Sequence, residues 1–250
     1  MMHRKTAQAL AVVALAAVPM FASAQLTANV ALTSNYKFRG QDQDVIGSNG
    51  TLKTKSFKPA IQGGFDYAFG ETGWYIGNWN SSVNWQPGNS IESDLYGGYK
   101  FTAGGIGWDL GALTYIYPGN KNGNTTEIYG AGTFGPATLK YSHTVSDDYF
   151  GFAGNSANSN RKGTNTGYLN LSVAQEIAPA LTLKAAVGYT RFSSDIKALK
   201  VPNYVDYALG VSYDFGSGVA LYGGVQGANK KAFFGDINKA RAIVTLSKTL

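Results

Sequence analysis

The sequence predicts an all-β protein: a closed antiparallel transmembrane β-barrel of twelve strands, with short periplasmic turns and longer extracellular loops. Three observations indicate this fold class. From Leu26 onward, apolar and polar residues alternate in segments of about ten residues, and the alternation recurs along the chain. The connections between segments are mostly long and short in turn, as such a barrel requires. Residues 25–250 contain no apolar stretch of about 18 residues, the length that a membrane-spanning helix needs.

The N-terminal 24 residues have the composition of a secretory signal peptide. A basic start at residues 3–5 precedes an apolar stretch at residues 9–21, and residues 22–24 form an Ala-Ser-Ala cleavage signal. We therefore expect residues 1–24 to direct Sec-type export and residues 25–250 to form a barrel in the outer membrane. Cleavage before Gln25 removes two basic residues and lowers the formal net charge from +6 to +4. That charge is too small and too dispersed to predict binding to nucleic acid.

Composition narrows the class of protein further. The chain contains no cysteine, which excludes disulfides, thiolate nucleophiles and cysteine metal sites. Glycine is frequent, at 32 of 250 residues, and tyrosine is the commonest aromatic residue, at 16. This composition is typical of an outer-membrane barrel, but also of a soluble β-sandwich. The alternation and the connections therefore have to decide between the two.

Each predicted strand is a run in which apolar residues recur at every second position. The predicted strands are, in order, residues 26–39, 61–69, 74–85, 91–102, 108–117, 125–134, 137–145, 167–176, 181–191, 204–215, 219–227 and 241–250. The first is the longest, because the alternation that starts at Leu26 continues through Tyr36 and Phe38. Apolar rows that define later strands are Leu95, Tyr99 and Phe101; Leu139, Tyr141 and Val145; and Leu183, Ala185, Val187 and Tyr189.

The third predicted strand has a distinctive pair of faces. In residues 74–85, Tyr75 and Trp79 are predicted on the apolar face, and Asn78 and Asn80 on the polar face. The alternation thus assigns the two aromatic residues to lipid and the two amides to the interior.

The connections predict the orientation of the barrel. The short ones are residues 70–73, 103–107, 135–136, 178–180 and 216–218, and the long ones are residues 40–58, 86–90, 118–124, 146–166, 193–203 and 228–239. Residues 86–90 fit this rhythm least well, because they are no longer than residues 103–107. Short turns belong to the periplasmic side, so both termini are expected there, with an even number of strands. Ten or fourteen strands remain alternatives to twelve.

Charged residues fall in the polar register of the predicted strands. On the lipid face, a Lys or Arg near mid-membrane would cost ~2–4 kcal/mol, so the polar register is expected to line the lumen. The candidate pore-lining residues are Lys37, Arg39, Asp66, Glu92, Asp94, Lys100, Asp109, Glu127, Lys140, Glu176, Lys184, Asp206, Asp214 and Arg241. Eight are acidic and six basic, so their count predicts no ion preference. Arg39 and Asp66 are the two that we expect to influence conductance.

Aromatic residues lie near the ends of the predicted strands, where interfacial girdles are expected. These residues are Tyr36, Phe38, Tyr67, Phe69, Trp74, Trp85, Tyr99, Phe101, Tyr213 and Phe215. Aromatic residues also favour strands in general, which is the alternative explanation of their positions.

The sequence gives little support to catalysis or metal binding. His143 is the only histidine after residue 24, and its same-face neighbours are Tyr141 and Val145 rather than a serine. We therefore predict that the protein is not an enzyme. Residues 25–250 contain no histidine cluster and no calcium-loop spacing. Asp147-Asp148 could hold Ca²⁺, but a solvated loop explains the pair better, so no metal and no cofactor are expected.

Several blocks resemble the TorF porin family of proteobacteria. They are residues 29–34, 36–40, 59–67, 94–100, 124–129, 140–142, 145–147 and 246–249, and they occur in the family's order along the chain. The chain departs from the family at Gln41-Asp42, where the family has Ile-Ser, and at Leu250, where outer-membrane proteins usually end in Phe. The resemblance implies an outer-membrane barrel that passes solutes, but it names no substrate.

Three functions remain open. The first is an outer-membrane porin for passive diffusion of ions or small polar solutes. The second is a non-conducting barrel with a role in adhesion or envelope structure. The third is a soluble periplasmic β-sandwich or lectin. Expected partners are outer-membrane lipid and lipopolysaccharide, the barrel-assembly machinery and small polar solutes or ions, with no nucleic acid. The oligomeric state is not predicted.

Overall fold

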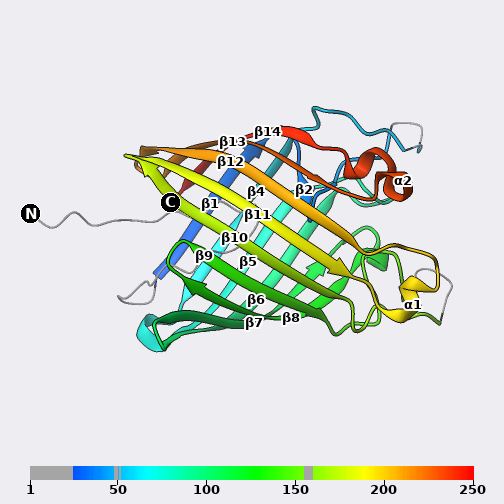
Figure 1. Cartoon of the computed structure of the whole chain (residues 1–250), viewed down its shortest axis with the longest axis horizontal. Helices are drawn as coiled ribbons and strands as arrows, with labels where there is room; N and C mark the ends of the chain where they lie inside the picture. The colour runs from blue at the N-terminus through cyan, green and yellow to red at the C-terminus, as the bar shows by residue number, and fades with distance from the viewer. Residues whose placement is uncertain (1–24, 48–49, 51, 155–159) are drawn as a thin grey trace, which may run out of the picture.

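Twelve strands close into a single antiparallel barrel (Figure 1). The structure is a computed structural model that describes residues 25–47, 50, 52–154 and 160–250, so the predicted signal peptide lies outside the described residues. The barrel strands are β1 (Gln25–Thr33), β4 (Ala60–Ala68), β5 (Trp74–Ser82), β6 (Ile91–Ala103), β7 (Ile106–Ile116), β8 (Thr125–Phe134), β9 (Ala137–Thr144), β10 (Gly167–Ala178), β11 (Leu181–Arg191), β12 (Tyr204–Gly216), β13 (Val219–Ala228) and β14 (Arg241–Thr249). β1 pairs with both β4 and β14, which closes the ring. The predicted fold class is confirmed, and the strand number is twelve.

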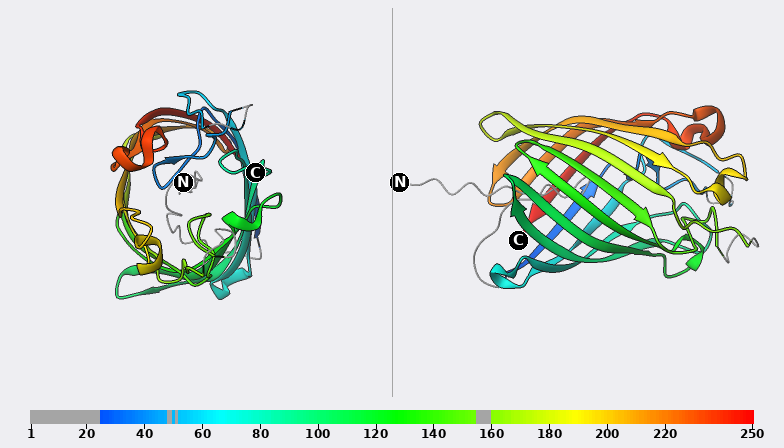
Figure 2. Two further views of the ribbon diagram at one scale, coloured as in Figure 1. Left: turned by 90° about the vertical axis from the view of Figure 1, so that its right-hand side faces the viewer. Right: turned by 60° about the horizontal axis from the view of Figure 1, so that its bottom comes forward.

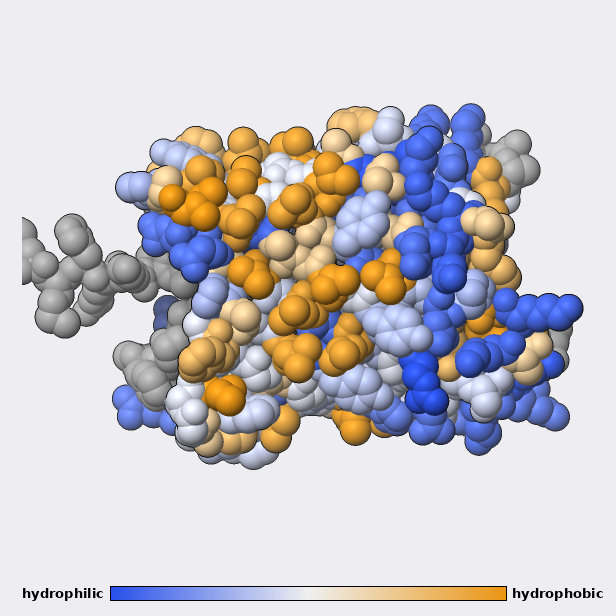
Figure 3. All heavy atoms as spheres, viewed as in Figure 1, coloured by the Kyte–Doolittle hydropathy of each residue, from blue (hydrophilic) through white to orange (hydrophobic). Residues whose placement is uncertain are grey.

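The alternation along each strand separates an apolar outside from a polar inside. In β6, Leu95 and Tyr99 are exposed, whereas Glu92 and Asp94 are buried. A soluble protein would show the opposite arrangement. Figure 3 shows the outer face of the strands around β10 to β12, where apolar residues gather in a band and hydrophilic residues gather beside the long connections. An apolar outer band around a polar interior is the pattern of a barrel that spans a membrane.

The connections divide the barrel into two ends, which we call the loop end and the turn end. The loop end carries the long connections with α1 (Ser194–Lys197), α2 (Lys231–Phe234), η2 (Lys121–Gly123) and η4 (Gly235–Asn238), and the turn end carries the tight turns and η1 (Gly70–Thr72) (Figure 1). No helix of the described residues is long and apolar enough to cross a membrane. Because the long connections lie at one end of the barrel and the tight turns at the other, their predicted separation is confirmed.

The first predicted strand is wrong in its length. β1 ends at Thr33, and the chain then leaves the wall to form a small separate sheet of β2 (Lys37–Phe38) and β3 (Gln41–Asp42). The backbone of this small sheet is also extended. Apolar and polar residues therefore continue to alternate in the sequence after the wall strand has ended. Tyr36 and Phe38 are accordingly inside the barrel and do not belong to an aromatic girdle.

The predicted faces of the third strand are reversed in β5. Tyr75 is buried, whereas its neighbour Trp74 is 58% exposed, and Trp79 lies on the inner face with Tyr75. Asn78 and Asn80 consequently lie on the outer face. The bulk of the tyrosine and tryptophan fills the interior, which the alternation of polar and apolar residues could not foresee.

Candidate functional site

A hairpin made by β2 and β3 folds into the lumen from the loop end. Its turn residues, Arg39 and Gly40, have φ angles of +46° and +76°, the combination of positive angles that a two-residue type I′ turn requires. A Cβ on Gly40 would lie 2.5 Å from the Gly227 carbonyl oxygen and 2.9 Å from the Ala228 Cβ, so the tip packs directly against β13. The left view of Figure 2 shows this segment, in blue, inside the ring of strands. We call residues 35–43 the inward hairpin.

Two ion pairs share one carboxylate at the base of the inward hairpin. Asp42 Oδ1 lies 2.9 Å from Lys37 Nζ, and Asp42 Oδ2 accepts from Arg241 Nη2 at 3.1 Å. Lys37 also donates to the Ile237 carbonyl oxygen at 3.0 Å, and all three charged side chains are buried. The hairpin is thereby tied to β14 and to η4. Such a buried network is strongly destabilised by the loss of any single member.

Arg39, at the tip, reaches the opposite part of the wall. Its Nη2 lies 2.6 Å from Glu127 Oε2 in β8, and its Nη1 donates to the Tyr149 hydroxyl at 3.3 Å. Its guanidinium also lies 4.2 Å from the centre of the Tyr168 ring in β10. Burial raises the pKa of the Tyr149 hydroxyl to about 12, so this hydroxyl stays neutral at ordinary pH. The hairpin therefore crosses the lumen and is held on both sides.

The wall around the inward hairpin is acidic. Glu92 accepts from the hydroxyls of Tyr36 and Tyr117 at 2.8 and 2.7 Å, and Asp206 accepts from Tyr168 at 3.1 Å. Asp94 Oδ1 and Asp206 Oδ2 are buried without a hydrogen-bond partner among the described residues. The positive hairpin thus occupies a negatively charged section of the lumen, and its departure would expose that charge.

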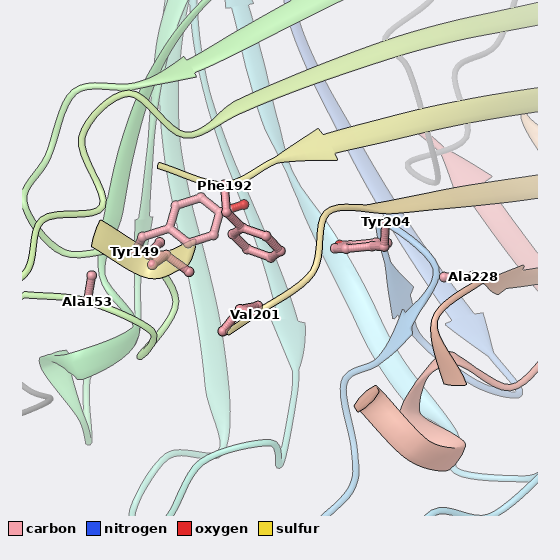
Figure 4. Packing of buried hydrophobic residues seen from close by; sticks show 7 residues of the cluster. Tyr149, Ala153, Phe192, Val201, Tyr204 and Ala228 are labelled. Carbon is pink, nitrogen blue, oxygen red and sulfur yellow. The ribbon is translucent and has the colours of Figure 1, made fainter. Parts of the chain in front are cut away.

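Aromatic side chains cover the hairpin from the loop end. Figure 4 shows part of the loop cluster, which consists of Tyr149, Ala153, Phe192, Ile196, Val201, Tyr204 and Ala228. Tyr149 packs edge-on against Phe192 with ring centres 5.9 Å apart. The neighbouring Phe150 packs against Phe38 of the hairpin, with ring centres 5.3 Å apart. The loops between β9 and β10, β11 and β12, and β13 and β14 therefore pack together with the hairpin.

The lumen on the turn-end side of the hairpin carries cations above tyrosine rings. Lys100 Nζ lies 4.5 Å from the centre of the Tyr75 ring, and Lys140 Nζ lies 3.8 Å from that of Tyr129. Tyr75 donates to Asp109 at 2.7 Å and is hydrogen-bonded to Tyr129. Among the described residues, neither lysine forms a salt bridge with a carboxylate. Their ammonium groups therefore lie against tyrosine rings instead of carboxylates.

Glycines let these tyrosines lie flat along the wall. A Cβ on Gly98 would lie 2.9 Å from Cζ of Tyr75, and one on Gly111 would lie 2.6 Å from Cζ of Tyr129. The small residue on one strand makes room for the ring of its partner on the adjacent strand, since Gly98 pairs with Tyr75 and Gly111 with Tyr129. The frequent glycines and tyrosines of the sequence therefore have a joint structural role in the lumen.

The structure places the fourteen predicted pore-lining residues in three groups. Those on the inner face of wall strands are Asp66, Glu92, Asp94, Lys100, Asp109, Glu127, Lys140, Lys184, Asp206 and Arg241. Lys37 and Arg39 belong to the inward hairpin instead of the wall. Glu176 is exposed, and Asp214 accepts from the Gly216 amide at 2.8 Å, both near tight turns. That these residues line a conducting path stays a prediction.

Sequence reasoning missed the residues that hold the hairpin. Asp42, Tyr117 and Tyr149 make contacts with residues far away in the chain, and no local pattern marks such contacts. The Arg39-Gly40 pair was the available signal, because a glycine between two short extended runs indicates a tight turn.

The hydrogen-bond partner of His143 in the described part of the chain is a tyrosine. His143 lies on the outer side of β9, where its Nδ1 is 3.2 Å from the Tyr141 hydroxyl. No group of three or more His, Asp or Glu residues among the described ones is arranged to hold a metal ion.

The fold and its interior define a class: a twelve-stranded transmembrane β-barrel with the architecture of outer-membrane porins. Residues 20–250 match the family described as "Bacterial protein of unknown function (Gcw_chp)", and the chain belongs to this family. Among curated proteins, none matches the chain.

Similar solved structures include two porins. A KdgM porin has a TM-score of 0.54 and 9% identity, covering 89% of this chain and 97% of that chain. A NanC porin has a TM-score of 0.53 and 10% identity, covering 90% of this chain and 98% of that chain. Another KdgM structure is described as a complex with disordered oligogalacturonate. At these identities the likeness shows the fold alone.

Proposed function

We propose that this protein is an outer-membrane channel that admits ions or small polar solutes by passive diffusion past the inward hairpin. The observation that carries the proposal is a polar, charged lumen inside a closed barrel, crossed by a hairpin that enters from the loop end. Export by residues 1–24 and insertion by the barrel-assembly machinery belong to the same proposal. The resemblance to TorF porins stays a prediction, and we propose no enzymatic activity.

The size of the barrel supports a narrow path. Barrels of about eight strands are filled by side chains, whereas those with 16 or more leave an aqueous channel. Twelve strands lie between these limits, and the hairpin with Phe38 and Arg39 takes up part of the interior. Solutes that pass must be small, and carboxylates and ammonium groups on the wall favour polar or charged ones.

Purified protein in planar lipid bilayers is expected to produce discrete conductance steps, and liposomes that contain it are expected to swell in small-solute gradients. Folding is checked by heat-modifiable mobility in gels, so that inactive aggregates are not scored as closed channels. Folded protein that gives neither steps nor swelling would contradict the proposal.

One observation favours a second function. The loop cluster and the inward hairpin pack together through aromatic contacts, and this is also expected of a barrel that is permanently closed at the loop end. Such a protein would act in adhesion or envelope structure through its loops. The absence of swelling together with correct folding would support this alternative.

A further inference from the structure

A polar patch interrupts the apolar outer surface of the barrel. It consists of Asn78 and Asn80 in β5, Ser93 in β6, Thr114 in β7 and Thr126 in β8, which all lie on the outer face and are partly exposed. Cross-strand pairing brings them side by side, because Asn80 is opposite Ser93 and Thr114 is opposite Thr126. We call these five residues the outer polar patch.

The outer polar patch lies at the depth of the membrane interior. Trp74, at the turn end of the same strand, marks one interface, and Ile61 and Ile91 continue the apolar surface beyond the patch. A strand tilted by 35–45° rises about 2.5 Å per residue along the membrane normal, which places Asn78 about 10 Å and Asn80 about 15 Å from the level of Trp74. The apolar band of such barrels is ~25 Å tall, so both amides fall within it.

The opposite side of the barrel shows no comparable feature. The outer residues in the middle of β10, β11 and β12 are aliphatic, as in Leu171, Val187 and Leu209, all of which are exposed. The outer surface is therefore asymmetric, with lipid-compatible side chains on one side and amides and hydroxyls on the other. Hydrocarbon offers no hydrogen-bond partner to such groups.

The internal hydrogen bonds of the patch leave an acceptor on Asn80 and a hydroxyl donor on Ser93 unused, and Thr114 and Thr126 share one hydrogen bond at 3.1 Å that uses only one of their two hydroxyl hydrogens. Asn78 Nδ2 donates to Ser93 Oγ at 3.3 Å and to the Asp94 carbonyl oxygen at 3.0 Å, and Asn80 Nδ2 donates to Asn78 Oδ1 at 2.5 Å. Among the described residues, no hydrogen bond uses Asn80 Oδ1 or the hydroxyl hydrogen of Ser93. One free acceptor thus lies beside one free donor on neighbouring strands.

We propose that the outer polar patch is the interface of a two-fold symmetric homodimer in the membrane. In such a dimer, Ser93 of one copy donates to Asn80 of the other copy, and the reverse bond forms by symmetry. A second copy fits better than lipid because it supplies both missing partners at once. The small residues Gly63 and Gly97 on the same outer face allow the two walls to approach closely. The proposal rests on the membrane location of the barrel and does not depend on conductance.

Single cysteines test this interface cleanly, because the chain contains no cysteine of its own. Leu95→Cys places a thiol at the centre of the patch, between Asn78 and Thr114. Leu209→Cys is the matched control on the aliphatic side, since Leu95 is 52% and Leu209 58% exposed. Mild oxidation of membranes is expected to cross-link Leu95→Cys into a dimer and to leave Leu209→Cys monomeric.

A second variant separates a specific dimer from crowding in the membrane. The combination Asn78→Leu, Asn80→Leu and Ser93→Ala, added to Leu95→Cys, removes the hydrogen-bonding groups and leaves an apolar surface. We expect about tenfold weaker dimerisation, because two intramembrane hydrogen bonds are lost. Heat-modifiable gel mobility checks that this barrel still folds. Equal cross-linking of Leu95→Cys and Leu209→Cys, unchanged dimerisation of the combined variant, or a monomeric mass of wild-type protein in mild detergent would each overturn the proposal.

Discussion

Arg39→Glu is expected to raise the conductance of the channel and to shift its ion preference toward cations. The substitution removes the partner of Glu127 and adds a carboxylate to a section of the lumen that already contains Glu92 and Asp94. Breaking a buried ion pair costs about 3–5 kcal/mol, so the hairpin tip should lose its attachment to β8. The lumen would then become both wider and more negative.

The reversal potential in a KCl gradient measures this shift directly. Arg191→Glu makes the same change of charge at an exposed position at the end of β11 and should leave the reversal potential unchanged. Adding Glu127→Arg to Arg39→Glu reverses the ion pair and should bring the conductance back toward the wild-type value. If Arg39→Glu behaves like Arg191→Glu, the hairpin does not line the conducting path.

Asp42→Ala is expected to release the inward hairpin from the lumen. Asp42 is the carboxylate shared by Lys37 and Arg241, and its loss leaves two buried cations facing each other. The variant is expected to lose about 3–5 kcal/mol of the free energy that holds the hairpin in the lumen. Trypsin cleaves after lysine and arginine, and Lys37 and Arg39 are only 2% and 7% exposed in the folded protein. The variant should therefore be cut within the hairpin, and the wild-type protein should resist.

Mass spectrometry of the tryptic fragments reports this release. Asp44→Ala is the matched control, because Asp44 pairs with Lys58 in a more exposed setting, with Oδ1 and Nζ 2.6 Å apart. Exposed pairs contribute only about 0–1 kcal/mol, so this variant should keep its hairpin protected. Protection of the hairpin in Asp42→Ala as complete as in the wild type would show that the shared carboxylate does not hold it.

The barrel could be predicted from sequence because its signal is local and repeated. Every wall strand, such as β6 or β11, must present one face to lipid and one to the interior, so the period of two appears in each of them. Tight turns such as Gly135-Pro136 mark the strand ends in the chain itself. These features need no knowledge of distant contacts, and they favour twelve strands, with ten and fourteen as alternatives, and the separation of long loops from short turns.

The inward hairpin could not be predicted in this way. Extended residues alternate equally well in a wall strand and in a small sheet inside the lumen, so Lys37 and Arg39 looked like a continuation of β1. What distinguishes them is the contact of Asp42 with Arg241 and of Arg39 with Glu127, which lie 199 and 88 residues apart.

The prediction of the inner and outer faces of β5 was wrong for a related reason. Asn78 and Asn80 appeared to belong to the lumen because amides avoid hydrocarbon. The interior instead takes up Tyr75, which bonds to Asp109, and Trp79, which packs against Tyr36. Packing in the lumen thus determined the register, and the misplaced amides became the outer polar patch.

The most direct test of the channel is the single-channel conductance of a variant in which a short Gly-Ser linker replaces residues 35–43. A comparable replacement of residues 52–57, most of which are exposed, serves as the control. If the inward hairpin forms the narrowest part of the lumen, its removal raises the conductance several-fold, whereas the control conducts like the wild type. Equal conductance of the folded hairpin variant and the wild type would contradict this account.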